Sequence, residues 1–208
     1  MEKETPPSEA MGLVNLASPR MGTEIHSVSD DFFAEAPRML QDTIPVFVPD
    51  KFDDNGKWMD GWESRRRRQG GHDWCIIKLG VPGVIRLVDI NTAHFTGNYP
   101  PGAMIEAGHS ADGDISKVEW KTLVDQVDLG PDLHHILPTN TLGPVNMVRL
   151  NIYPDGGVAR LRLFGDVNYD WENEKSDICE LSALKLGGCI LGYNDCLLYT
   201  SPSPRDPN

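Results

Sequence analysis

Residues 147–165, MVRLNIYPDGGVARLRLFG, constrain the fold more than any other stretch of the chain. Apolar and polar side chains alternate on both sides of a Pro-Asp-Gly-Gly sequence at 154–157, and this period of two is that of a half-buried β-strand. Turn residues between two such runs are typical of a β-hairpin. We therefore predict a hairpin with one face in a core and with Arg160 and Arg162 on the solvated face.

Other short apolar runs are separated by turn residues at the spacing of an all-β sandwich or barrel: 74–80, 84–90, 103–108 and 119–125. The first of these runs is expected to end in the Gly-Val-Pro-Gly sequence at 80–83. A short helical piece is expected near 29–40, where Ser29 or Asp30 could provide the cap. The pattern as a whole predicts an all-β fold.

The composition excludes several classes of function. The 208 residues hold 19 basic and 31 acidic side chains, and a chain with a formal net charge of −12 is repelled by phosphate backbones, so we expect no nucleic-acid partner. No apolar run reaches the roughly 18 residues of a membrane span, and the polar N-terminus lacks the apolar core of a secretory signal. The four cysteines lack CxxC spacing, which favours free thiols in a reducing compartment. We expect a cytoplasmic protein and leave a peroxisomal location open.

An internal similarity suggests a tandem repeat. Residues 16–30, LASPRMGTEIHSVSD, align without gaps on residues 181–195, LSALKLGGCILGYND. The identical pairs are Leu16 and Leu181, Gly22 and Gly187, Ile25 and Ile190, and Asp30 and Asp195. We interpret the alignment as a duplication whose second copy is truncated after its opening strands.

This interpretation divides the chain into five segments. They are a disordered lead-in at 1–11, a complete β-sandwich repeat at 12–165, a linker at 166–179, the start of a second repeat at 180–196, and a tail at 197–208. The tail is rich in Ser and Pro and resembles translated adapter sequence, so we expect it to be non-native.

Two loops gather side chains that could carry chemistry. WMDGWESRRRRQGGHDW at 58–74 holds carboxylates and four consecutive arginines, and DINTAHFTGNYPP at 89–101 adds a histidine and asparagines. Such a set can bind a small anion bidentately and can supply groups for proton transfer. The simpler interpretation is structural, with Asp-Gly turns, core tryptophans and a hydrogen-bonded histidine. HxH, HExxH and CxxC are absent, so no metal site and no cofactor are predicted, although a divalent metal is left open.

Four blocks, in order along the chain, resemble those of the allantoicase (allantoate amidinohydrolase) family: GKWMDGWESRRRR…HDWCIIKLG, VDINTAHFTGNYPP, LGP…H and VRLNIYPDGGVARLRLFG. The resemblance covers about 12–165 and 180–196. It implies two similar jelly-roll β-sandwiches of the galactose-binding-like type and assembly into homo-oligomers. It also implies hydrolysis of allantoate to ureidoglycolate and urea in purine (allantoin) degradation.

The resemblance places these loops at the site, and the chemistry of allantoate suggests roles within them. The substrate carboxylate calls for a bidentate cation, its ureido groups for an amide partner, and the release of urea for an acid and a base. We expect Arg65 or Arg67 on the carboxylate, Asn98 on a ureido group, Glu63 or Asp60 as base, and His94 as acid or oxyanion donor.

Two alternatives remain open. A jelly-roll sandwich can be a non-catalytic carbohydrate- or small-ligand-binding module. The run Arg65–Arg68 could instead serve nucleic-acid binding or nuclear import, although the acidity of the chain argues against this. The chain also departs from the family pattern, because it lacks the second copy of the functional blocks. If the site needs residues from both repeats, this chain is inactive.

Overall fold

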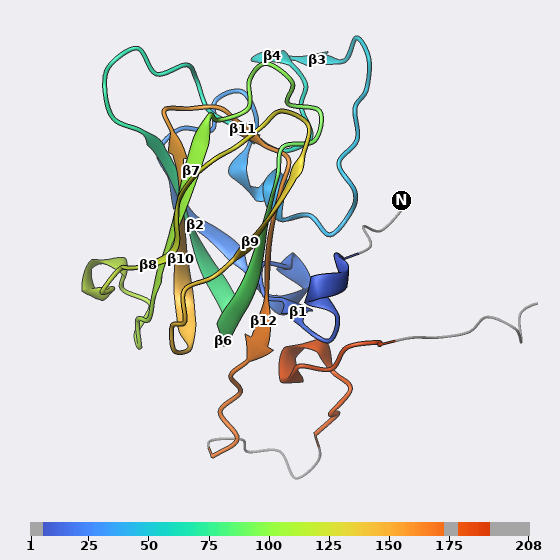
Figure 1. Ribbon diagram of the computed structural model, residues 1–208, viewed down its shortest axis with the longest axis vertical. Helices are drawn as coiled ribbons and strands as arrows, with labels where there is room; N and C mark the ends of the chain where they lie inside the picture. Colours follow the sequence, from blue (N-terminus) through green and yellow to red (C-terminus); the bar gives the residue numbers. More distant parts are fainter. Residues whose placement is uncertain (1–5, 173–178, 192–208) are drawn as a thin grey trace, which may run out of the picture.

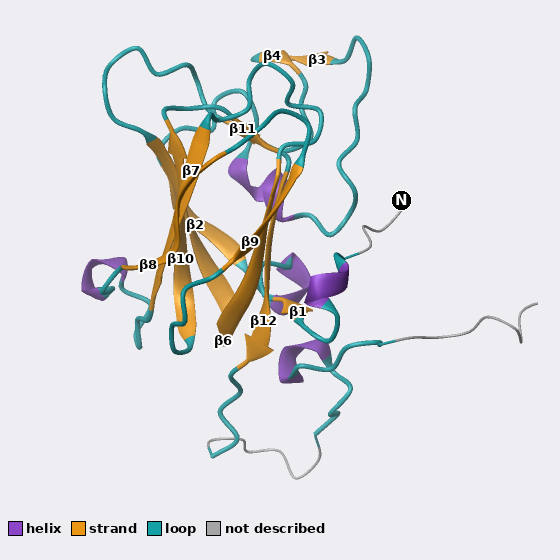
Figure 2. Cartoon of the chain, in the orientation of Figure 1, coloured by secondary structure: helices purple, strands orange, loops and turns teal. Residues whose placement is uncertain are grey.

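The computed structural model describes residues 6–172 and 179–191 (Figure 1). Within those ranges the chain consists of β-strands, loops and short 3-10 helices, with no α-helix (Figure 2). The 3-10 helices are η1 Ser8–Ala10, η2 Pro19–Met21, η3 Ala36–Leu40, η4 Ile115–Lys117 and η5 Leu184–Leu186. The strands are β1 Val14–Asn15, β2 Glu24–Val28, β3 Phe52–Asp53, β4 Gly56–Lys57, β5 Trp62–Glu63, β6 Asp73–Asn91, β7 Gly102–Gly108, β8 Lys121–Asp128, β9 His134–Pro138, β10 Val145–Tyr153, β11 Gly157–Val158 and β12 Arg160–Val167. No helix in this part of the chain is long and apolar enough to cross a membrane.

One eight-stranded antiparallel sheet carries the fold, along the path β1-β12-β6-β10-β7-β8, and β2 and β9 also pair with β6. Strand β6 is 19 residues long, and its two halves have different partners. The first half pairs with β2 and β10, and the second with β9 and β12. The sheet folds over on itself through this strand and forms two layers (Figure 1). The expected all-β sandwich is therefore confirmed.

The core lies between the two layers. Alternate positions of β6, β10 and β12 supply its buried side chains, among them Ile77, Val88, Ile90, Val148, Leu150, Ile152, Leu161 and Leu163. Trp62 is fully buried, and its indole nitrogen donates to the Asp30 carbonyl at 2.9 Å. Each large apolar side chain buried in this way contributes roughly 1.5–3 kcal/mol. The strand faces therefore form a rigid frame on which the loops are held.

The predicted hairpin at 147–165 is wrong in its pairing. Its two strands form as β10 and β12, but β6 lies between them in the sheet, so they do not pair with each other. The segment that joins them is occupied by β11, which pairs with β5. Alternation identified the strands correctly, but it contains no information on which strand is the neighbour. The 154–157 segment crosses between the layers instead of closing a two-residue turn.

The predicted solvated face of this segment is also wrong. Arg160 is 0% exposed and Arg162 is 4% exposed. A covering loop explains their burial: Arg160 donates to Asp60 Oδ2 at 2.7 Å and to the Thr43 carbonyl at 2.8 Å, and Arg162 donates to the Gln41 carbonyl at 2.6 Å. These arginines anchor the loop over the sheet, a role that period-two alternation cannot distinguish from exposure.

Residues 80–83 do not end a strand, because β6 continues through them. A Cβ on Gly80 would lie 2.2 Å from the Met21 carbonyl oxygen, so glycine here permits the close approach of η2. The Pro82 carbonyl accepts from Asn168 N at 2.8 Å. The register with β10 shifts in this region, so the Gly-Pro sequence marks an irregularity within a long strand and not a turn.

The helical piece expected near 29–40 is the short 3-10 helix η3, and it begins later than expected. Neither expected residue caps it: Ser29 donates to Asp73 Oδ1 at 2.9 Å, and Asp30 accepts from the Arg65 side chain. Both side chains instead bind residues that are distant in the sequence, Ser29 binding Asp73 and Asp30 binding Arg65.

The two segments of the internal similarity share a local structure. Helix η2 ends at Gly22 with φ of 90°, and η5 ends at Gly187 with φ of 89°, both in the left-handed region that favours glycine. Their surroundings differ, because Leu16 is 1% exposed and its counterpart Leu181 is 71% exposed. Asp195 and the tail at 197–208 lie outside the described residues.

The division of the chain into five segments stays a prediction, although two of its segments contain defined structure. Part of the expected lead-in forms η1, in which Ala10 is buried, and β12 runs two residues into the expected linker.

Candidate functional site

A pocket of about 450 Å³ lies where three loops meet at one end of the sandwich, the upper end in Figure 1. Its walls come from the last residue of β5 and the segment after it, the segment before β7, the segment before β11, and Phe33. The lining residues of these three segments are Glu63, Ser64, Arg66 and Arg67, then Gly97, Asn98, Tyr99 and Pro101, and then Pro154, Asp155 and Gly156. The rigid strands bring these loops together although they are far apart in the sequence. Loops held on such a scaffold are the usual position of binding and catalytic groups.

Close backbone contact fixes the loops to one another. Gly157 N donates to the Asn98 carbonyl at 2.7 Å, and Gly157 stands opposite Glu63 in the β5–β11 pair. Gly156 has φ of 143°, and a Cβ at this position would lie 2.5 Å from Pro100 N. Glycine is therefore required both by the backbone conformation and by the space. The consequence is that Glu63 and Asn98 face each other.

Glu63 is the ionisable group at the centre of this contact. Asn98 Nδ2 donates to Glu63 Oε1 at 2.7 Å, and among the described residues this is the only hydrogen bond to the carboxyl group. Burial raises the pKa of Glu63, and the hydrogen bond from Asn98 opposes that rise. A carboxyl group whose pKa is raised by burial is a candidate for proton transfer.

Arg67 is the cation of the pocket. Its backbone N–H donates to Asp155 Oδ2 at 2.7 Å, and its Nη2 donates to the buried Asp73 Oδ1 at 2.7 Å. Ser29 donates to the same Asp73 oxygen at 2.9 Å. The Nε of Arg67 is buried and has no hydrogen-bond partner among the described residues. A buried donor without a partner costs free energy, and such groups are found where a ligand or water completes the structure.

A comparison with known families shows which family the chain belongs to. The family profile described as Allantoicase repeat matches residues 14–168. The chain belongs to the allantoicase repeat family. Relatives named "Probable allantoicase" are 51% identical in Acinetobacter baumannii (strain ACICU) and 49% identical in Acinetobacter baylyi. The matches cover 87% and 91% of this chain but 54% and 56% of those relatives, so the chain spans about half of their length.

Solved structures of the family have the same fold. A structure of allantoicase is 30% identical with a TM-score of 0.71, over 90% of this chain and 59% of that one. The allantoicase of Saccharomyces cerevisiae is 33% identical with a TM-score of 0.66, over 76% and 49%. A family 32 carbohydrate-binding module of C. perfringens NanJ, 9% identical over 73% of this chain and 98% of its own, has a TM-score of 0.51, which shows a shared fold alone. The expected galactose-binding-like jelly roll is confirmed.

The pocket around Glu63 brings together three of the six side chains predicted from the sequence, Glu63, Arg67 and Asn98. Arg65 lies outside it, since its Nε donates to Asp30 Oδ2 at 2.7 Å and its guanidinium lies 5.1 Å from the Phe32 ring centre.

The other two predicted residues lie in or against the covering loop: Asp60 belongs to it, and His94, between β6 and β7, contacts it. Asp60 is buried against Arg160 and also accepts from Val46 N at 2.9 Å, which is a structural role. His94 has a positive φ of 67°, and its Nε2 lies 3.3 Å from the Pro45 carbonyl oxygen. Its ring stands beside Phe47, so it holds the loop at 45–47 and does not line the pocket.

Sequence reasoning missed two residues that position Arg67. Asp155 belongs to an Asp-Gly turn, for which the simpler interpretation is structural, and Asp73 is one of the carboxylates of the loop at 58–74. The Pro-Asp-Gly-Gly sequence was a usable signal for Asp155, because an aspartate in a tight turn often binds backbone N–H groups. No spacing rule links Asp73 to Arg67, since the contact depends on the path of the arginine loop.

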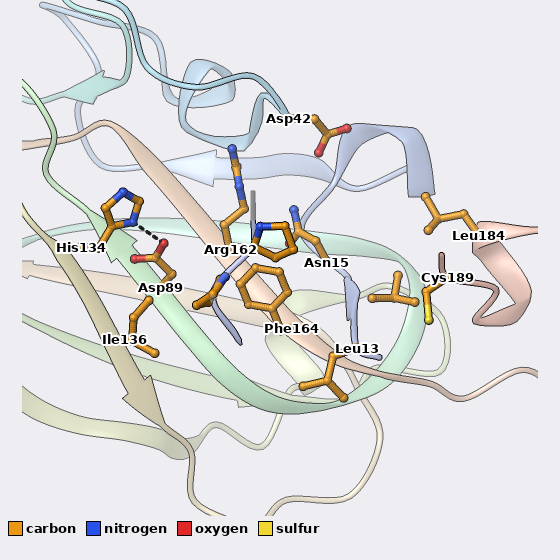
Figure 3. A pocket seen from close by; sticks show the side chains of 13 residues that line it. Leu13, Asn15, Asp42, Asp89, His134, Ile136, Arg162, Phe164, Leu184 and Cys189 are labelled. Atoms are coloured by element: carbon orange, nitrogen blue, oxygen red, sulfur yellow. Dashed lines mark hydrogen bonds and ion pairs between the residues drawn. The ribbon is translucent and has the colours of Figure 1, made fainter. Parts of the chain in front are cut away.

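A second pocket of about 450 Å³ lies on the outer face of β6, β9 and β12 (Figure 3). Its walls are largely apolar, and its polar end holds Asp89, His134 and Arg162. Asp89 Oδ2 lies 2.7 Å from His134 Nδ1, and Asn91 Nδ2 lies 3.3 Å from His134 Nε2. Asp89 and Arg162 are also neighbours in the β6–β12 register. These charged groups contact one another and the backbone, which is the pattern of a structural cluster.

In the part of the chain that the structure describes, no three His, Cys, Asp or Glu side chains gather closely enough to hold a metal ion.

Proposed function

We propose that the pocket around Glu63 binds allantoate and that the protein hydrolyses it to ureidoglycolate and urea. The observation that carries the proposal is the meeting of a half-buried carboxyl group, an amide and a guanidinium in one pocket, in Glu63, Asn98 and Arg67. Membership of the allantoicase repeat family supports the choice of substrate.

In this proposal, allantoate is bound by the cationic side chain of Arg67 and the neutral side chain of Asn98. The Arg67 guanidinium carries the charge and the planar donors that suit a substrate carboxylate. Asp73 accepts from this guanidinium, and Asp155 accepts from the Arg67 backbone N–H. Asn98 offers both a donor and an acceptor to a ureido group. Arg65, Asp60 and His94 take no part, because their contacts lie elsewhere.

Glu63 moves the protons in this proposal. In its protonated form it donates a proton to the departing ureido nitrogen as the bond from that nitrogen to the central carbon breaks, which releases urea. The carboxylate then takes a proton from water as the water oxygen bonds to the same carbon and forms the hydroxyl group of ureidoglycolate. Burial raises the pKa of Glu63, which favours the protonated form that this first step requires.

Self-association, a cytoplasmic location and the absence of nucleic-acid and membrane partners stay predictions from the sequence. We add to the proposal that this chain supplies one of the two repeats from which the longer relatives are built, since it spans 54% of their length.

Urea release tests the proposal. The 208-residue chain is incubated with allantoate beside its Glu63→Gln variant, and Glu119→Gln serves as a control because Glu119 is exposed and distant from the pocket. We expect urea from the unchanged chain and the control and a loss of at least 100-fold in Glu63→Gln. Equal rates in all three proteins would remove Glu63 from the mechanism. If the chain alone releases no urea, calorimetric titration with allantoate tests the binding step with Arg67→Met.

A further inference from the structure

A shallow depression of about 730 Å³ adjoins the Glu63 pocket. It is lined by the arginine loop at 65–68 together with Phe33 and Gln69. Phe33, Arg66 and Arg67 line both hollows, so the depression and the pocket are neighbours. A small molecule that enters the pocket from this side passes the arginine loop.

The four arginines of the loop are not equivalent. Arg65 forms an ion pair with Asp30 and Arg67 forms one with Asp73, although Arg67 Nε keeps no hydrogen-bond partner among the described residues. Arg66 and Arg68 are exposed, and within residues 6–172 and 179–191 no hydrogen bond or ion pair involves either guanidinium. The loop therefore presents two uncompensated positive charges at the mouth of the pocket.

These charges stand out against the charge of the whole chain, which is −12. A small anion approaching such a chain is repelled on average, and a local cluster of cations at a concave site raises its concentration there. Exposed guanidinium groups act over about a Debye length, roughly 8 Å at physiological salt.

We propose that Arg66 and Arg68 form an outer anion site that captures the substrate carboxylate and delivers it to Arg67. This inference rests on the proposed function and concerns capture, whereas Glu63 concerns the chemistry. A carboxylate leaving the outer site for Arg67 exchanges two hydrated guanidinium groups for one that is held by Asp73.

Removal of both charges tests the outer site. We expect the double variant Arg66→Gln, Arg68→Gln to lose about fivefold to tenfold in kcat/KM and in allantoate affinity at low ionic strength, with kcat unchanged. The difference should fall below twofold at 0.5 M NaCl, roughly where exposed charges are screened. The control is Arg20→Gln, Arg86→Gln, which removes the same number of charges at exposed positions outside the loop.

Two measurements separate this inference from the proposed function, namely urea release and calorimetric titration with allantoate. Salt-sensitive binding without urea release overturns hydrolysis and leaves capture standing. Urea release in which the loop variant behaves like the control overturns capture and leaves hydrolysis standing, and so does a fall in kcat with KM unchanged. Tighter salt-sensitive binding of a short DNA duplex than of allantoate would assign the two arginines to nucleic acid and overturn the outer site.

Discussion

Two pockets of about the same volume, 450 Å³, place a carboxylate beside other polar groups, yet their carboxylates have different partners. Asp89 lies on a strand face, touches His134 at 2.7 Å and is next to Arg162 in the register. Glu63 lies at the edge of a loop, and its hydrogen bond comes from the neutral amide of Asn98. The difference teaches that a buried charge does not by itself mark a site. The nature of its partner decides whether it stabilises the fold or stays able to exchange a proton.

The partner also explains the electrostatics. An opposite charge holds a carboxylate in its ionised form, whereas burial without such a charge favours the protonated form. Glu63 is in the second situation, and burial raises its pKa. The Asp89 cluster instead groups side chains from three neighbouring strands, with Asp89 on β6, His134 on β9 and Arg162 on β12 (Figure 3).

The largest expected effect is that of Glu63→Gln on turnover. The substitution keeps the shape and the acceptor for Asn98 Nδ2 but removes the exchangeable proton. We expect the rate of urea release to fall at least about 100-fold, with KM for allantoate within threefold. A fall of less than threefold in kcat would place the chemistry elsewhere and end the contrast between the pockets.

A smaller effect is expected on binding from Arg67→Met. Loss of charge-assisted hydrogen bonds to the substrate carboxylate should raise KM or Kd about 10- to 100-fold, corresponding to roughly 1.5–3 kcal/mol. Arg67→Lys should recover the charge beside Asp73 but only part of the affinity, because an ammonium group lacks the planar fork. Arg65→Met is the matched control and should change KM less than twofold. Steady-state kinetics of the three variants would show whether Arg65 has been wrongly set aside.

In the second pocket we expect an effect on stability and none on activity. His134→Ala removes a partner of the buried Asp89 and should lower the free energy of unfolding by about 1–3 kcal/mol. Urea release and allantoate affinity should stay within twofold of the unchanged chain at a temperature where both are folded. Urea denaturation followed by fluorescence measures the first quantity. A large loss of activity in a folded His134→Ala protein would transfer the site to this pocket.

The smallest effect concerns the pH dependence of stability. Because the pKa of Glu63 is higher in the folded chain than in the unfolded chain, the folded state binds more protons between the ordinary and the raised value. The contribution of Glu63 to stability is therefore full below its ordinary pKa and is lost as pH rises through the raised value.

Glu63→Gln carries no such dependence, so it should be at least as stable as the unchanged chain at pH 7, and the two should converge near pH 3. Paired melting curves across this range measure the difference. The quantity compared is the stability of the variant minus that of the unchanged chain. If this difference is smaller at pH 7 than at pH 3, the raised pKa of Glu63 is contradicted.

Much of the architecture could be predicted from the sequence, and the errors in that prediction have one cause. Alternation located β10 and β12, but their separation by β6 depends on the 19-residue length of that strand, which continues through Gly80 and Pro82. Alternation also led to the prediction that Arg160 is exposed to solvent. The sequence of its own strand contains no signal for the loop that places Asp60 against it. Local pattern predicts elements, whereas pairing and covering are properties of the whole chain.

The residues of the candidate site could be predicted only in part, for a related reason. The loop sequences pointed to Glu63, Arg67 and Asn98, but they did so equally for Arg65, which turns toward Asp30. His94 looked equally suitable, and its positive φ directs it toward Pro45. Residue type and position in a loop narrow the candidates, and the path of the backbone selects among them.

The most direct test is a titration of the isotope-labelled chain with allantoate, followed by amide NMR shifts. We expect shifts concentrated at Arg67, Asn98 and Gly156, which saturate with ligand and are lost in Arg67→Met. Shifts concentrated at Asp89 and His134 instead, or no shifts at any of these residues at millimolar allantoate, would contradict the assignment of the substrate to the Glu63 pocket.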